Sequence, residues 1–277
     1  MNIRVTRISL IAALMLIMTF EACTQAPQPQ QSPQQSPTKL PTLIGVYRPS
    51  MATFYLRDQN TPGEPNAAVA FGAKGDIPIA GDWDGNGTAS IGVYRPDVST
   101  FFLRNSNSIG DADLILALGA KGDIPVVGDW DGNRSTTVGV YRPSNSTFYL
   151  WNSNSVGQPD MIFPFGAEGD IPIVGDWDGN GSATIGLYRP KISTFYLRNS
   201  NSLGEPDMIF SFGASGDKPV VGDWDGNGST TIGLYRSANA TFYLRNSNSA
   251  GQPDIVVPFG LAGDIPVVGR WTSARTP

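Results

Sequence analysis

The chain has 277 residues, of which 40% are hydrophobic and 16% are charged, a balance that suits a packed globular domain. It contains no histidine and a single cysteine, Cys23. The lack of histidine excludes a His-activated nucleophile, a His base and a His metal ligand, and one cysteine excludes an intrachain disulfide. The net charge of -5 argues against a nucleic-acid-binding protein.

The first residues have the pattern of a bacterial secretory signal. Arg4 and Arg7 give a short positive start, and residues 8–20 form an apolar run. This run is too short for a permanent membrane span but suits the apolar core of a signal peptide. Residues 1–22 are therefore predicted to be a signal peptide that directs secretion across the bacterial inner membrane.

The only cysteine follows this run directly. Residues 20–23, Phe-Glu-Ala-Cys, resemble the lipobox of bacterial lipoproteins, in which cleavage precedes a cysteine that then carries lipid. The resemblance implies lipidation of Cys23 and attachment to the membrane through that lipid. The alternative is ordinary signal cleavage after Ala22 or Ala26. Residues 23–41 are rich in Gln, Pro and Ser, and are predicted to be a tether because they cannot bury apolar surface.

From Ile44 onward the sequence repeats with a period of 47 residues and no insertion. The copies start at Ile44, Ile91, Val138, Ile185 and Ile232. Each copy has four short segments rich in β-branched and aromatic residues, separated by turn residues and without helical spacing. Four strands per repeat with such a period predict an all-β fold, a five-bladed β-propeller over residues 42–277. A parallel β-helix is the alternative.

One segment of each copy carries a proline at the same place. These prolines are Pro78, Pro125, Pro172, Pro219 and Pro266. Because proline cannot donate to a strand ladder, this segment is predicted to be the innermost strand of each blade, with one unpaired edge. Residues 264–271 are such a segment and are predicted to complete the blade whose other strands lie in residues 43–72. That pairing would close the ring.

Four copies continue into an Asp-Trp-Asp-Gly-Asn loop with oxygen-bearing side chains at positions one, three and five. The candidate metal ligands are Asp82, Asp84, Asn86, Asp129, Asp131, Asn133, Asp176, Asp178, Asn180, Asp223, Asp225 and Asn227. Oxygen ligands at alternate positions with a glycine at position six suit calcium. Arg134 stands in place of that glycine in the second loop. The alternative is a metal-free hairpin in which the Asp side chains cap backbone N–H groups.

The loop pattern resembles the calcium loops of FG-GAP and VCBS repeats, which occur in integrin α-chain propellers and many bacterial surface proteins. The likeness covers residues 44–271. It implies an extracellular binding or adhesion protein whose loops hold calcium. The family has an Asp at position nine, whereas this chain has Ser90, Thr137, Thr184 and Thr231. Fewer charges imply weak calcium affinity.

Fivefold repetition turns single residues into rings. The tyrosine ring is Tyr47, Tyr94, Tyr141, Tyr188 and Tyr235, the arginine ring is Arg48, Arg95, Arg142, Arg189 and Arg236, and the tryptophan ring is Trp83, Trp130, Trp177, Trp224 and Trp271. Packing between blades is one interpretation, with arginine paired to the repeated Asp76, Asp123, Asp170, Asp217 and Asp264. Five sugar-binding pockets are the other. Trp151 replaces an arginine of the other copies, and an exposed Trp151 is a candidate ligand contact.

The sequence therefore predicts a non-enzymatic binding or adhesion propeller at the bacterial cell envelope or surface. Its expected partner is an extracellular protein or glycan, with no nucleic acid. One alternative is a lectin with up to five equivalent sites, similar to the five-bladed tachylectin type in architecture and period. Another is an envelope enzyme that acts on polysaccharide through an Asp/Glu pair. Nearly every acidic residue is repeated, whereas an active site is usually unique, so no catalytic residue is predicted.

Overall fold

The computed structural model describes residues 40–271. The predicted signal peptide, the lipidation of Cys23 and most of the predicted tether lie outside the described residues. The described part contains twenty β-strands and two short 3-10 helices, η1 (Pro96–Val98) and η2 (Pro190–Ile192). None of its helices is long and apolar enough to cross a membrane. The prediction of an all-β fold is confirmed.

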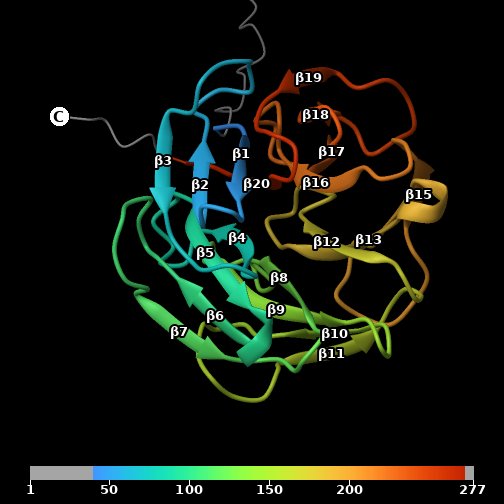
Figure 1. Cartoon of the computed structure of the whole chain (residues 1–277). Coiled ribbons are helices and arrows are strands. Elements are labelled where there is room, and N and C mark those ends of the chain that lie inside the picture. The colour runs from blue at the N-terminus through green and yellow to red at the C-terminus, as the bar shows by residue number, and fades with distance from the viewer. Residues whose placement is uncertain (1–39, 272–277) are drawn as a thin grey trace, which may run out of the picture. The chain divides into compact units, whose positions relative to one another are not determined.

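The strands form five four-stranded antiparallel sheets, which we call blades A to E (Figure 1). Blade A consists of β20 (Ile265–Gly269), β1 (Leu43–Arg48), β2 (Thr53–Leu56) and β3 (Ala67–Ala70). Blade B consists of β4 (Ile77–Gly81), β5 (Ser90–Arg95), β6 (Thr100–Leu103) and β7 (Leu114–Ala117). Blade C consists of β8 (Ile124–Gly128), β9 (Thr137–Arg142), β10 (Thr147–Leu150) and β11 (Met161–Pro164). Blade D consists of β12 (Ile171–Gly175), β13 (Thr184–Arg189), β14 (Thr194–Leu197) and β15 (Met208–Ser211). Blade E consists of β16 (Lys218–Gly222), β17 (Thr231–Arg236), β18 (Thr241–Leu244) and β19 (Ile255–Pro258). The five-bladed propeller is confirmed, and the parallel β-helix is excluded.

The proline-bearing strands are the innermost strands, as predicted. β4, β8, β12, β16 and β20 contact one another in succession around the ring. Each pairs along one edge with the second strand of its own blade, so that Pro78 lies opposite Val93. The other edge has no strand partner in its sheet. A proline therefore fits there at no cost to the pairing.

The ring closes through the last strand, as predicted. β20 pairs antiparallel with β1, from Leu43 opposite Gly269 to Tyr47 opposite Ile265. In Figure 1 the red strand β20 lies beside the blue strand β1. The ends of the described chain thus complete one blade between them, and the first strand of the propeller has no open edge.

The hydrophobic core lies between the blades. Tyr47 of blade A is fully buried and packs against Phe54, with ring centroids 4.8 Å apart. It shares a core cluster with Ile91 and Val93 of blade B. Its hydroxyl donates to the carbonyl of Ala73, in the loop that precedes β4, at 3.3 Å. All members of the tyrosine and tryptophan rings are buried. The packing interpretation of these two rings is confirmed, and a ligand cannot reach them.

Candidate functional site

The predicted calcium loops connect the inner and second strands, and their Asp side chains cap the loop backbone. In the first loop, Asp82 accepts the N–H of Asn86 at 2.9 Å through Oδ1 and the N–H of Gly87 at 2.7 Å through Oδ2. The Asn86 amide oxygen accepts the N–H of Thr88 at 2.8 Å. The loops that start at Asp129 and Asp176 repeat this pattern. This geometry is that of an Asx-type turn.

Arg134 leaves the second loop unchanged in shape. Its φ of 75° is left-handed, as is the φ of 87° at Gly87. The N–H of Arg134 donates to Asp129 Oδ2 at 2.7 Å, as the Gly87 N–H does to Asp82. Arg134 therefore adopts a left-handed backbone conformation that residues other than glycine rarely adopt.

The loops also join neighbouring blades. The N–H of Asp82 in blade B donates to the hydroxyl of Thr136, which precedes β9 of blade C, at 3.0 Å. The N–H of Thr136 donates back to the Asp82 carbonyl at 2.7 Å. Thr230 and Thr42 receive the same contact from Asp176 and Asp223. Each loop therefore contributes to blade assembly whether or not it holds an ion.

The candidate ligands of the first three loops are all oxygen atoms, the type that a hard cation prefers. Burial raises the pKa of Asp82 more than the N–H groups of Gly87 and Asn86 lower it, and the nearby charge of Asp84 raises it further. Burial raises the pKa of Asp129 and Asp176 in the same way. The loop N–H groups therefore offset only part of the desolvation of these three carboxylates. A calcium ion would be held by Asp82, Asp84 and Asn86 and their equivalents.

The position-nine hydroxyls are not available as ligands. Thr137 is buried and donates to the Gly128 carbonyl at 3.2 Å, and its equivalents make the same bond inside their hairpins. Among residues 40–271, no three Asp or Glu side chains gather into a metal-ligand cluster. Each loop therefore offers two carboxylates and one amide, the small charge that weak calcium binding implies.

The first carboxylate of the fourth loop has a counter-charge that comes from the residue after β20. Arg270 occupies the position of Asp82 in the repeat, and its Nη2 donates to Asp223 Oδ2 at 2.8 Å. Asp223 is buried. The guanidinium neutralises this carboxylate, whereas the equivalent carboxylates of the other loops are held by backbone N–H groups.

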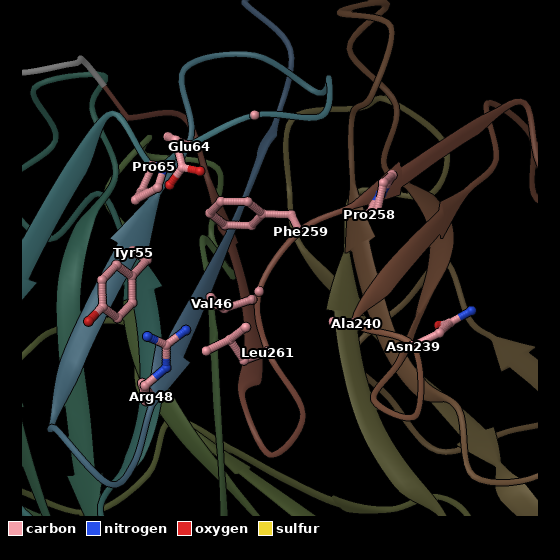
Figure 2. A pocket seen from close by; sticks show the side chains of 12 residues that line it. Val46, Arg48, Tyr55, Glu64, Pro65, Asn239, Ala240, Pro258, Phe259 and Leu261 are labelled. Carbon is pink, nitrogen blue, oxygen red and sulfur yellow. The ribbon is translucent and has the colours of Figure 1, made fainter.

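A second kind of candidate site is a groove between blades E and A, with a volume of about 420 Å³. Figure 2 shows Arg48 and Tyr55 on one wall and Pro258 on the other, with Phe259 between them. Glu64 stands at one end of the groove. A groove of this size falls within the range of small-molecule sites, about 300–1,000 Å³.

An equivalent groove lies between blades A and B, with a volume of about 480 Å³. Arg95, Phe102 and Asp111 line it at the repeat positions of Arg48, Tyr55 and Glu64. The aromatic position is Tyr55, Phe102, Tyr149, Tyr196 and Tyr243 around the ring. The repeat position of Glu64 holds an acidic or amide side chain in every copy: Glu64, Asp111, Gln158, Glu205 and Gln252. The repeat thus places similar groups at all five blade boundaries.

The groove arginine is held by a buried carboxylate. Arg48 Nε and Nη2 each donate to one oxygen of Asp264 at 2.9 Å, and the Asp264 side chain is only 2% exposed. The hydrogen bond to Asp264 raises the pKa of Arg48. The guanidinium carbon lies 4.4 Å from the centroid of the Tyr55 ring, a cation–π contact. The predicted pairing of the arginine ring with the Asp residues is confirmed in all five copies.

Trp151 corrects one prediction, because it is 6% exposed and is no surface contact. Its indole N–H donates to the carbonyl of Gly157 at 2.9 Å. In the other copies an arginine such as Arg57 donates to carbonyls of the same loop, including that of Thr61. Trp151 therefore clamps its loop as the arginines do. In this one copy, tryptophan replaces the arginine, and the buried indole holds the loop through its N–H group.

Sequence analysis missed the groove residues Tyr55 and Glu64. The period-2 alternation in Thr53–Leu56 was a usable signal, since it buries Phe54 and Leu56 and turns Tyr55 to the opposite face. No such signal marks Glu64, whose place in the groove depends on the fold of the β2–β3 loop.

Compared with known proteins, the chain matches no protein-family model and no curated protein sequence.

Proposed function

We propose that this protein is a non-enzymatic, multivalent binding module that serves adhesion at the bacterial cell envelope. The observation that carries the proposal is the recurrence of one groove at equivalent positions of the repeat, seen at both boundaries of blade A. Linked weak sites gain avidity when they engage a repetitive surface together. Five blades of one design suit such a surface better than they suit a single small substrate.

The arrangement of acidic residues supports a non-enzymatic role. The most buried repeated carboxylates, Asp76 and its equivalents, are bound bidentately by arginine and lie in salt bridges. The loop carboxylates cap backbone N–H groups. Both sets therefore have structural partners, and neither resembles the unpartnered acid and base that glycoside hydrolysis needs.

The envelope location rests on the sequence. The lipobox-like residues 20–23 and the tether that follows would hold the propeller away from a membrane surface. The resemblance to FG-GAP and VCBS repeats supports an extracellular adhesion role. In this proposal Cys23 carries the lipid, and the loops of blades B, C and D bind calcium weakly. The loop of blade E uses Arg270 instead.

Co-sedimentation with isolated bacterial envelope fragments tests the proposal. We expect the purified protein to pellet with the fragments in a saturable manner. Serum albumin and the heat-unfolded protein serve as controls for non-specific adsorption. Retention no greater than that of albumin across envelopes from several bacteria would contradict the binding role.

A further inference from the structure

The groove between blades E and A combines apolar faces with hydrogen-bonding groups. Tyr55 and Pro65, both half-buried, supply the accessible apolar surface, whereas Phe259 is buried in the floor of the groove. Arg48 uses Nε and Nη2 for Asp264, which leaves Nη1, beside Tyr55, as its remaining donor edge. Glu64 is exposed and its side chain makes no hydrogen bond within residues 40–271. The groove therefore offers a donor edge, an acceptor and an aromatic hydroxyl.

The charge balance of this groove selects against anionic ligands. Asp264 neutralises Arg48 in a bidentate pair at 2.9 Å. Glu64 is then the charged group that remains exposed, because Arg57 beside it is buried and donates to loop carbonyls, and the chain as a whole has a net charge of -5. An acidic ligand would meet this carboxylate, whereas a neutral ligand with hydroxyl groups could donate to it.

We propose that the interblade grooves bind neutral hexopyranose units of a polysaccharide, an inference that rests on the proposed binding function. A pyranose has an apolar C–H face, which suits the groove's ring surfaces, and a rim of hydroxyl groups. In the E/A groove those hydroxyls would donate to Glu64 and accept from Arg48 Nη1 and the Tyr55 hydroxyl. The carboxylate serves only as an acceptor, and no bond is broken.

The grooves differ in ways that provide internal controls. The A/B groove has Phe102 in place of Tyr55 and so lacks the aromatic hydroxyl. In blade D the Tyr196 hydroxyl already accepts from Arg189 Nη1 at 3.2 Å, so both groups are engaged, whereas the Tyr55 hydroxyl makes only a weak hydrogen bond to the Met51 thioether at 3.5 Å. We therefore expect the E/A groove to bind most tightly and the A/B groove to bind more weakly.

Titration with single sugars tests the proposal directly. The purified protein is titrated with the methyl glycosides of glucose, galactose and mannose, and with methyl glucuronide, by saturation-transfer NMR. We expect saturable millimolar binding of at least one neutral glycoside and no binding of the glucuronide. Binding of the glucuronide alone, or of none of the four, would overturn the proposal.

A matched set of variants locates the site. Replacing Tyr55, Tyr149, Tyr196 and Tyr243 with Phe gives every groove the residue that blade B already has. Loss of one hydrogen bond per groove is expected to weaken binding by about threefold to tenfold. Tyr47→Phe is the control, because it removes a hydroxyl that is buried between blades and faces no groove. Glu64→Gln, a residue present in two sister repeats, is a second variant and is expected to weaken the E/A groove. Unchanged affinity in both the Phe set and Glu64→Gln would overturn the assignment.

Treatment of envelope fragments separates this inference from the proposed function. Periodate cleaves the vicinal diols of sugars, and protease removes surface proteins. Loss of co-sedimentation after periodate alone supports a sugar ligand. Loss after protease alone overturns the sugar ligand and leaves the binding function intact. Failure to bind untreated fragments contradicts the binding function, and the glycoside titration then decides the sugar proposal independently.

Discussion

Arg134 occupies a backbone conformation that glycine holds in the sister loops. Its φ is 75°, while Gly87 at the same repeat position has a φ of 87° and open space where a Cβ atom would stand. We expect Arg134→Gly to raise the free energy of unfolding by about 0.5–1 kcal/mol, because relief of left-handed strain exceeds the added freedom of the unfolded chain. Denaturant unfolding measures this change.

The reciprocal variant is the control. Gly87→Arg places the same side chain in the same conformation one blade away and is expected to lower the free energy of unfolding by a similar amount. If neither substitution alters the unfolding midpoint, left-handed backbone strain at this position does not affect the stability of the protein.

Lys218 is the one charged residue among the five equivalent first positions of the inner strands. The other four are Ile77, Ile124, Ile171 and Ile265, all half-buried. Burial lowers the pKa of Lys218 more than the nearby charge of Asp264 raises it. We expect Lys218→Ile to stabilise the protein by about 1 kcal/mol at neutral pH through added apolar burial. Thermal and denaturant unfolding measure the gain.

The advantage of Lys218→Ile is expected to shrink as the pH rises. Between the lowered pKa of native Lys218 and its unfolded value near 10.5, the unfolded chain holds a proton that the native state has lost. The stability of the wild-type protein from this group therefore increases with pH over that window, and the isoleucine variant lacks the increase. An advantage that grows from neutral to alkaline pH would contradict this account.

At the scale of the strand, much of the fold follows from local patterns. The period-2 alternation of side chains within Thr53–Leu56 distinguishes the core residues Phe54 and Leu56 from Tyr55. Pro78 identifies an inner strand because proline has no backbone N–H to donate to a second neighbouring strand. Those rules involve only neighbours in the chain or in one sheet. The fate of Trp151 and the place of Glu64 depend instead on how a ten-residue loop folds back over its blade, which repeat periodicity does not specify. Tertiary contacts therefore determine both the burial of Trp151 and the position of Glu64.

The calcium loops give a prediction at the scale of the element. We expect calcium to raise the melting temperature relative to a chelator, because each occupied loop adds about 1.4 kcal/mol to the free energy of unfolding when calcium is about tenfold above Kd. Asp84→Asn, Asp131→Asn and Asp178→Asn together should abolish the shift, since they remove one exposed carboxylate from each of the first three loops. Asp225→Asn is the matched control, because Arg270 already neutralises the fourth loop. Identical melting curves in calcium and chelator would rule out the ion.

Closure makes the ring one structural unit. β20 supplies a full ladder to β1, Asp264 pairs with Arg48, and the Arg270 carbonyl accepts the N–H of Ala89 in blade B at 3.0 Å. β20 also contacts β16 of blade E and β4 of blade B, so one short strand contacts the blades on either side of blade A. The two grooves that flank blade A depend on that join, because blade A is complete only when β20 pairs with β1.

Removal of the closing strand tests this dependence. Deletion of residues 264–277 would expose the inner edge of β1 and leave Arg48 without Asp264, at a cost of more than about 5 kcal/mol, comparable with the stability of a whole domain. We expect the truncated chain to lose its cooperative melting transition or to associate through the open edge. Deletion of residues 272–277 is the control, because it keeps every described strand. A peptide of residues 262–277 should restore the transition by pairing with β1. If the truncated chain melts as the control does, the five blades are stable without the join, and the ring is not a cooperative unit.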